Sequence, residues 1–276
     1  MKRISAIIAV ILGALSGTAS ATTILFNDFS NVSTLQLNGN AAQAGTALRL
    51  TPATLGQSGT AFYSSAISLA SNVSFSSAFS FRISNSGGIG DGDGVGADGI
   101  TFIVQTNSST AGGAGGGIGY HGVPNSVAIE YDTFDNGPSL NDPDGNHVGI
   151  DLGGNIASTA SASVATRMND GNIWYSWVDY NGVTMLLEVR LSQTSIRPSS
   201  AILSQTVNLA TELGTTNAFV GFGSGTGSGF GDHDILSWEF RDTFNPINGS
   251  VPEPDTLALL ALGLLGLPWL RRRSLR

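Results

Sequence analysis

The sequence predicts an all-β fold, a β-sandwich or jelly roll of antiparallel sheets, for residues 22–247. No apolar period of 3.6 residues persists over the length of a helix in this region. Short alternating apolar segments recur instead, and Gly, Asn, Ser and Pro separate them. No change of composition divides the 226 residues, a length that one sandwich domain can accommodate. Many short strands separated by turns favour a sandwich over a parallel α/β fold.

The expected strands follow from apolar residues that alternate with small or polar ones. Such alternation places every second side chain on the same face of a sheet. The apolar members of the clearest segments are, in chain order, Phe79, Phe81 and Ile83; Ile129 and Tyr131; Met185, Leu187, Val189 and Leu191; and Leu236, Trp238 and Phe240. A further strand is expected within a glycine-rich stretch.

That stretch runs from Gly87 to Gly119 and contains thirteen glycines. The apolar segment Gly99–Val104 lies within it and reads as a core strand. Backbone that approaches a ligand closely, or that takes a positive φ, favours glycine. We therefore interpret the rest of the stretch as two long binding loops that flank this strand.

Residues 1–21 have the three parts of a secretory signal peptide. Lys2 and Arg3 form the basic start, Ile4–Leu15 is an apolar run, and Ala19–Ala21 is a small-residue cleavage site. The run has twelve residues, fewer than the ~20 that span a bilayer. We therefore expect removal of this segment and export of the chain.

Residues 248–276 read as a linker followed by a sorting or anchor segment. Pro252–Pro254 spells Pro-Glu-Pro, Thr256–Leu270 is apolar, and Arg271–Arg273 is basic. This order resembles the PEP-CTERM sorting tail of Gram-negative bacteria. The resemblance implies a transient inner-membrane anchor, cleavage by an exosortase-type enzyme, and delivery to the cell surface or extracellular matrix. A permanent single-pass anchor is the alternative.

Acidic side chains dominate the middle of the chain. The whole chain has a formal net charge of −8, but residues 22–247 hold eighteen acids against six arginines, a difference of −12. Such a domain repels nucleic acid and anionic membranes, because phosphate binding depends on clustered Lys and Arg. We expect no nucleic-acid partner, and membrane contact only through the C-terminal segment. The absence of cysteine excludes disulfides, a thiolate zinc site and a cysteine nucleophile.

Nine acids, and no lysine or arginine, occur between positions 82 and 167. Strand alternation places Glu130 and Asp132 on one face, and the Pro- and Gly-rich loop that follows can return Asp142 and His147 to them. Carboxylates at contact distance repel by roughly 4 kcal/mol per pair at moderate effective dielectric. Because no basic side chain is near in sequence, we predict that a divalent cation neutralises the cluster.

The ligand types suit two ions. Oxygen ligands from Asp132, Asn136, Asp142 and a backbone carbonyl suit Ca²⁺. A set that includes the imidazole of His147, with Glu130, Asp132 and Asp142, suits Mn²⁺ or a similar transition ion.

Motifs along nearly the whole of residues 22–247 resemble the legume (L-type) lectins, the concanavalin A group. In chain order they are Leu48–Thr51, Gly59–Tyr63, Phe75–Phe79, Gly96–Phe102, Gly115–Gly119, Ser126–Asn136, Asp142–Pro143, His147–Asp151, Val220–Gly227 and Asp234–Trp238. The resemblance implies a concanavalin A-like jelly roll of antiparallel sheets and a metal-dependent, non-catalytic carbohydrate-binding protein. Its oligomeric state, including a homo-oligomer, stays open.

The resemblance also implies roles for individual residues. The transition-metal ligands would be Glu130, Asp132, Asp142 and His147, and the Ca²⁺ ligands would be Asp132, the Phe134 carbonyl, Asn136 and Asp142. The sugar contacts would be the Asp98 carboxylate, the Gly116 backbone N–H, the Phe134 ring, the Asn136 amide, and Gly227 and Ser228. A cis peptide is implied between Ala97 and Asp98. The last loop is unusually rich in glycine, so sugar preference does not carry over.

Two other functions stay open. A structural matrix protein could keep the sandwich without binding sugar. A jelly-roll glucan hydrolase is the other, because Glu130, Asp132 and Asp135 resemble the Glu-x-Asp-x-x-Glu strand of laminarinase-like enzymes. Retaining hydrolysis needs two carboxyl groups about 5 Å apart, and carboxylates that bind ions are poor general acids. We therefore expect no enzyme.

Overall fold

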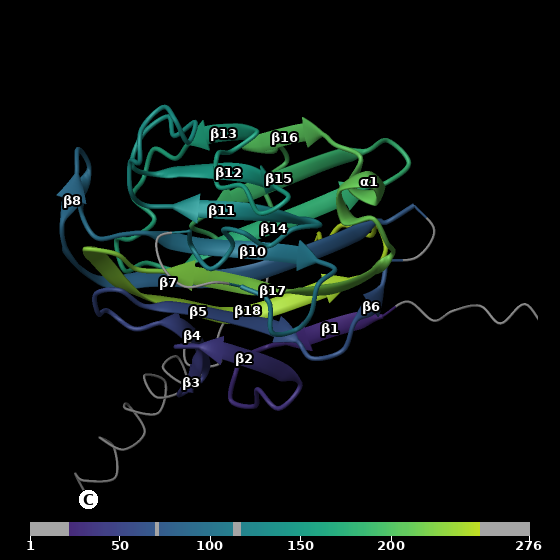
Figure 1. Cartoon of the computed structure of the whole chain (residues 1–276), viewed down its shortest axis with the longest axis horizontal. Coiled ribbons are helices and arrows are strands. Elements are labelled where there is room, and N and C mark those ends of the chain that lie inside the picture. The colour runs from purple at the N-terminus through teal and green to yellow at the C-terminus, as the bar shows by residue number, and fades with distance from the viewer. Residues whose placement is uncertain (1–21, 70–71, 113–116, 249–276) are drawn as a thin grey trace, which may run out of the picture.

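Two eight-stranded antiparallel sheets form most of the fold, which confirms the predicted all-β sandwich (Figure 1). The computed structural model describes residues 22–69, 72–112 and 117–248, so the predicted signal peptide, Gly116 and residues 249–276 of the predicted tail lie outside it. The first sheet has the order β16 (Leu203–Thr206), β15 (Leu186–Ser192), β14 (Trp174–Asn181), β7 (Phe75–Gly88), β18 (Gly229–Arg241), β4 (Ala47–Thr51), β3 (Ala42–Ala44), with β1 (Thr23–Phe26) beside β18.

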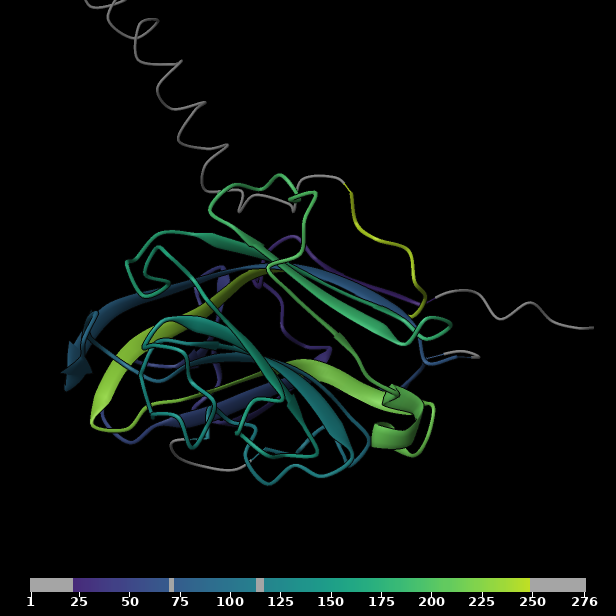
Figure 2. The same ribbon diagram turned by 90° about the horizontal axis from the view of Figure 1, so that it is seen from above.

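The second sheet carries the predicted site. Its order is β13 (Ala160–Ser163), β12 (His147–Leu152), β11 (Ser126–Asp132), β10 (Gly99–Gln105), β17 (Asn217–Gly225), β5 (Ser58–Tyr63), β2 (Leu35–Gly39), with β6 (Ile67–Ser68) beside β17. Figure 2 shows the two sheets as separate curved layers. The expected core strand at Gly99–Val104 is confirmed as β10, and it lies between β11 and β17.

Aromatic side chains join the two layers. Phe79 of β7 contacts Phe102 of β10, Tyr131 of β11 and Phe222 of β17, with ring centroids 5.8, 5.7 and 5.0 Å apart. These four rings are at most 1% exposed. Burial of large aromatic rings is a dominant contribution to stability, and these rings lie in the apolar core between the sheets rather than in the acidic loops.

Three local features differ from the sequence prediction. The first glycine-rich loop contains a small hairpin, β8 (Gly90–Asp91) with β9 (Gly94–Val95), which projects at one end of the sandwich (Figure 1). Met185 is not a strand residue, because it takes a φ of 56° at the end of a turn and is 40% exposed. A five-residue helix, α1 (Leu209–Leu213), is too short to leave a periodic pattern. Within the described ranges, no helix is long and apolar enough to cross a membrane.

A buried histidine lies in β18, where β18 pairs with both β4 and β7. His233 is 0% exposed, and its Nδ1 lies 2.8 Å from the Thr51 hydroxyl. Burial lowers the pKa of His233 to about 4, although the charges of Asp234 and Asp232 favour the protonated ring. Arg49, which pairs with both acids, opposes protonation.

Replacing His233 with Asn should make the free energy of unfolding less dependent on pH. The unfolded chain protonates this histidine near pH 6.5, whereas the folded chain does so only near pH 4. Wild-type stability therefore loses about 2 kcal/mol from this group between pH 7 and pH 5, and the variant lacks that loss. Urea unfolding of both proteins at the two pH values measures the difference. Equal pH dependence in the two proteins would contradict a neutral buried ring.

Candidate functional site

The predicted ligands meet at neighbouring strand ends. In the antiparallel register, Asp132 at the end of β11 pairs with His147 at the start of β12 and with Gly99 at the start of β10. Asp98, which precedes β10, is therefore close to the same strand ends. The loop 133–146 connects β11 to β12 and carries Asp142. The antiparallel register thus brings residues that are up to 49 positions apart in the sequence to the same end of three neighbouring strands.

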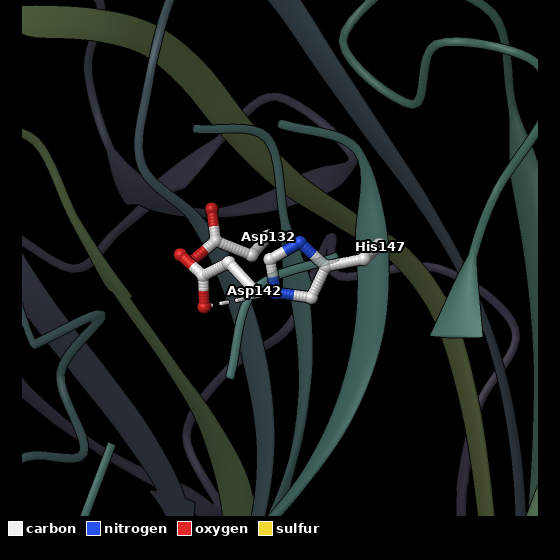
Figure 3. A group of neighbouring side chains, drawn as sticks. All are labelled: Asp132, Asp142 and His147. Carbon is white, nitrogen blue, oxygen red and sulfur yellow. Dashed lines mark ion pairs between the residues drawn. The ribbon is translucent and has the colours of Figure 1, made fainter. Parts of the chain in front are cut away.

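His147 faces two carboxylates. Its Nε2 lies 3.5 Å from Glu130 Oε1 and 3.6 Å from Asp142 Oδ1, and the ring is 0% exposed. One ligand atom each from Asp132, Asp142 and His147 lies within 4.8 Å of the others. Figure 3 shows the His147 ring and the carboxylates of Asp132 and Asp142 close to one another. The four residues predicted as transition-metal ligands are therefore brought together.

The cluster is a concentration of buried negative charge. Glu130 and Asp132 are 2% and 4% exposed. Burial, followed by the charge of Glu130, raises the pKa of Asp132 well above its ordinary value. Burial opposes protonation of His147, but Glu130 and Asp142 outweigh it and raise the pKa of the ring. Among the described residues, no lysine or arginine forms an ion pair with these acids. The charge is left for a cation to balance.

A backbone carbonyl orients the His147 ring. Its Nδ1 lies 2.8 Å from the Asp144 carbonyl, which can only accept, so Nδ1 carries the proton. Nε2 is then the nitrogen that faces the carboxylates and that would offer its lone pair to a metal ion, and it has no hydrogen-bond partner among the described residues. Metal-binding histidines commonly donate their other ring N–H to a backbone carbonyl in this way. One imidazole nitrogen with three carboxylates fits a transition ion.

Ser158 and Asp151 support the cluster, and the sequence reasoning assigned neither a role. The Ser158 hydroxyl lies 2.5 Å from Glu130 Oε1 and 2.8 Å from Asp151 Oδ1. Burial, followed by the charge of Glu130, raises the pKa of Asp151 well above its ordinary value. A hydroxyl has one proton to donate, so Ser158 can donate to only one of these two carboxylates at a time. Strand alternation with His147 could have identified Asp151; nothing local marks Ser158.

The loop after β11 folds around the same carboxylates. The Phe134 N–H donates to Asp132 Oδ1, and the Asn136 N–H donates to Asp142 Oδ2, both at 2.7 Å. Phe134 is half-buried and Asn136 is exposed. Oxygen-rich surroundings of this kind fit Ca²⁺. The structure thus brings the backbone of both residues to the cluster, while ligation by the Phe134 carbonyl and the Asn136 side chain stays a prediction.

Asp98 is a buried carboxylate without an obvious structural partner. It is 9% exposed, and its Oδ2 has no hydrogen-bond partner among the described residues. Burial raises the pKa of Asp98 to about 6. The peptide between Ala97 and Asp98 is cis, as the resemblance implies. A Cβ built on Gly227 would lie 3.7 Å from Asp98 Oδ2, so the predicted last loop does approach this carboxylate.

Ser228 and Gly116 belong to the remaining predicted sugar contacts. Ser228, which follows Gly227, accepts a backbone hydrogen bond from Ile89 at 3.0 Å. Gly116 lies outside the described residues. The roles of Asn136 and Phe134 toward a sugar stay predictions.

The β8–β9 hairpin contacts the loop 133–146, which carries predicted metal ligands. The sequence did not predict this contact. Asp91 Oδ2 accepts from the Asp135 N–H at 2.6 Å. The same oxygen lies so close to Gly145 that a Cβ there would be 2.0 Å away. Arg167 pairs with Asp93 at 3.3 Å and donates to the Val95 carbonyl at 2.9 Å. The hairpin therefore links the last loop, through Ile89, to the loop that carries the predicted ligands.

Two family models match the chain. The legume lectin domain matches residues 21–254, and the PEP-CTERM protein-sorting motif matches residues 250–274. A relative is the L-type lectin-domain containing receptor kinase VIII.1 of Arabidopsis thaliana, which is 32% identical over 184 residues. That match covers 64% of this chain but 25% of the kinase, so the chain spans about a quarter of the relative's length.

Solved lectins share the fold. The basic winged bean lectin, solved with Tn-antigen, has a TM-score of 0.67 at 29% identity and covers 80% of this chain and 98% of its own. The winged bean acidic lectin, solved with methyl-α-D-galactose, has a TM-score of 0.68 at 28% identity with the same coverage. Matched over most of its length by the domain model, with the paired sheets and the strand-end cluster in place, the chain belongs to the legume lectin domain family.

Proposed function

We propose that this protein is a metal-dependent lectin that binds a glycan without catalysis, through loops held by Ca²⁺ and by Mn²⁺ or a similar ion. The observation that carries the proposal is Asp98, a buried carboxylate whose Oδ2 has no partner among the described residues, beside the last loop. Sugar hydroxyls donate to such an acceptor, and charge-assisted hydrogen bonds are the stronger kind. The acidic cluster stands behind it at the neighbouring strand ends.

The two ions would neutralise the carboxylates. Glu130, Asp132, Asp142 and His147 would hold the transition ion, and Asp132, Asp142, Asn136 and the Phe134 carbonyl would hold Ca²⁺. This chain's own contribution is to shape the loop: Asp132 and Asp142 already accept the backbone N–H groups of Phe134 and Asn136. A loop fixed in this way presents the Asn136 amide as a donor next to the Asp98 acceptor.

The glucan hydrolase is disfavoured by where its third carboxylate lies. Asp135 lies beyond the end of β11, is exposed, and accepts from the Gly137 N–H at 2.7 Å. Glu130 and Asp132 are buried in the cluster instead. Two carboxyl groups that flank a glycosidic bond must both reach the sugar, and this pattern does not provide that arrangement. We infer that the chain is not an enzyme.

The place of action follows from the two chain ends. We infer export through the segment 1–21, with residues 22–247 as the lectin domain and 248–276 as linker and sorting segment. The PEP-CTERM match at 250–274 supports delivery to the surface or extracellular matrix of a Gram-negative cell after exosortase-type processing. A glycan of the exopolysaccharide or cell surface is the expected partner.

A glycan array with the purified protein tests the proposal. Because the winged bean lectins were solved with Tn-antigen and methyl-α-D-galactose, galactose-type supports are the first to try, with mannose supports beside them. Saturable binding to a defined glycan class in Ca²⁺ and Mn²⁺ is the expected result. No binding to any glycan would favour the matrix protein, and β-glucan hydrolysis that stops in Glu130→Gln would establish the hydrolase.

A further inference from the structure

A line of buried polar side chains crosses the core from one sheet to the other. His233 Nδ1 lies 2.8 Å from Thr51 Oγ1, and Thr51 Oγ1 lies 2.9 Å from Ser224 Oγ. Ser224 Oγ donates to the Gly99 carbonyl at 2.8 Å. His233 and Thr51 belong to the first sheet, and Ser224 and Gly99 to the second. All three side chains are 0% exposed, so water does not compete for these bonds.

The direction of every hydrogen bond in this line is fixed by its end. The Gly99 carbonyl can only accept, so Ser224 uses its one proton there. Thr51 must then donate to Ser224, and His233 must donate from Nδ1 to Thr51. The His233 ring is therefore neutral with its proton on Nδ1. Its Nε2, which has no hydrogen-bond partner among the described residues, is left unprotonated.

Charged neighbours of His233 are satisfied elsewhere. Asp234 accepts from Arg49 at 2.8 Å and pairs with Arg82 at 3.3 Å. Asp232 pairs with Arg49 at 3.1 Å and accepts from the Asn85 amide at 2.7 Å. These acids therefore do not draw the ring away from Thr51, and the line keeps one arrangement.

The line ends beside the acceptor proposed for the sugar. Gly99 directly follows Asp98, whose N–H donates to the Gly225 carbonyl at 3.3 Å and whose carbonyl accepts from the Thr133 N–H at 2.9 Å. Gly99 has a φ of 145°, and a Cβ there would lie 2.2 Å from the Tyr131 carbonyl, so this backbone tolerates only glycine. The bond from Ser224 fixes the Gly99–Ile100 peptide, one peptide beyond the one that joins Asp98 to Gly99.

We propose that His233, Thr51 and Ser224 are positioning residues, which orient the Asp98 carboxylate for its ligand through the carbonyl of Gly99. The proposal rests on the proposed lectin function for its readout in glycan binding. It assigns to a histidine in the opposite sheet a role in the sugar site, although this side chain touches neither sugar nor metal ligand. The direction of each bond is set once the Gly99 carbonyl accepts from Ser224.

Affinity for the glycan found on the array provides the first test. Ser224→Ala and His233→Leu should each weaken binding by about tenfold, in line with the loss of a buried hydrogen bond and the shift that follows. The double variant should bind the glycan as tightly as the single variant with the lower affinity, because both substitutions break the same series of hydrogen bonds. His233→Asn, whose amide N–H can replace Nδ1–H, should recover most of the affinity. Ca²⁺ affinity should stay within about twofold in all of them, since the metal ligands keep their contacts.

Ser237→Ala is the matched control. Ser237 also lies in β18, is 0% exposed, and pairs by its hydroxyl with Ser80 at 2.6 Å, away from Gly99. It should lower stability but leave glycan affinity unchanged. Equal affinity in Ser224→Ala and the wild type, or an equal loss in Ser237→Ala, would overturn the proposal.

Nitrogen NMR of the His233 ring in the wild-type protein separates this proposal from the lectin function itself. We expect a proton on Nδ1 and none on Nε2 at pH 7, with or without glycan. We also expect the Asp98 and Gly99 amide resonances to move in His233→Leu and to stay in Ser237→Ala. A ring protonated on Nε2 alone, or Asp98 and Gly99 amide resonances that do not move in His233→Leu, would overturn the proposed positioning role even if the protein binds glycans. If no glycan binds, the proposed function fails while these measurements still decide the line.

Discussion

Removal of divalent ions should abolish glycan binding while the sandwich stays folded. Without a cation, Glu130, Asp132 and Asp142 gather around His147 with no lysine or arginine of the described residues paired to them. Carboxylates at contact distance repel by roughly 4 kcal/mol per pair at moderate effective dielectric. They must then take up protons or move apart, and the loop that carries Asn136 moves with Asp142. The aromatic core, which includes Tyr131, lies on the opposite face of β11 from Glu130 and Asp132 and keeps its contacts.

The measurement is retention on the glycan support found on the array, before and after EDTA, with metal content followed by elemental analysis. We expect complete loss of retention, an unchanged β-sheet circular dichroism spectrum, and recovery when Ca²⁺ and Mn²⁺ are added together. His147→Gln should need more Mn²⁺ for recovery, whereas the exposed His121→Gln should behave as the wild type. Full retention by protein shown to be free of metal would contradict the proposed role of the ions.

The strands could be predicted because their cause is local. In a strand with one buried face, apolar residues recur at every second position of the sequence. Ile129 and Tyr131 in β11 are an example, and they are 1% and 0% exposed. Met185 shows where this fails, because the turn before β15 gives it a positive φ. The pairing of the strands into two sheets depends on contacts between distant segments, and for this the motifs that resemble the lectins were needed.

The candidate site likewise has contacts that local spacing predicts and contacts that depend on distant segments. Glu130 and Asp132 share a strand face, and His147 opens the next strand, so spacing alone brings these residues together. Ser158 reaches Glu130 from a separate loop, and Asp91, in a hairpin 39 positions before Glu130, reaches the loop that follows β11 at Asp135. No local pattern records such contacts. The line from His233 to Gly99 is likewise visible only when both sheets are in place.

Replacement of Asp98 by Ala should reduce glycan affinity at least about a hundredfold. Each hydrogen bond from a sugar hydroxyl to a charged acceptor contributes roughly 1.5–3 kcal/mol, and a carboxylate offers two oxygens. Loss of two such bonds, at about 1.4 kcal/mol per tenfold change in affinity, exceeds two orders of magnitude. Asp98→Asn keeps the shape and one acceptor oxygen, so its loss should be smaller. Titration calorimetry with the array ligand measures both variants.

The stability of these variants distinguishes a binding residue from a structural one. A buried carboxylate oxygen without a partner disfavours folding, and Asp98 Oδ2 has none among the described residues. The free energy of unfolding at pH 7 should therefore stay level or rise in Asp98→Ala, while Ca²⁺ affinity is kept. Ser237→Ala serves again as the control, because Ser237 is buried and its hydroxyl pairs with Ser80. An Asp98→Ala protein that binds glycan like the wild type would remove the acceptor on which the proposed sugar site depends, and one that unfolds would make Asp98 a structural residue instead.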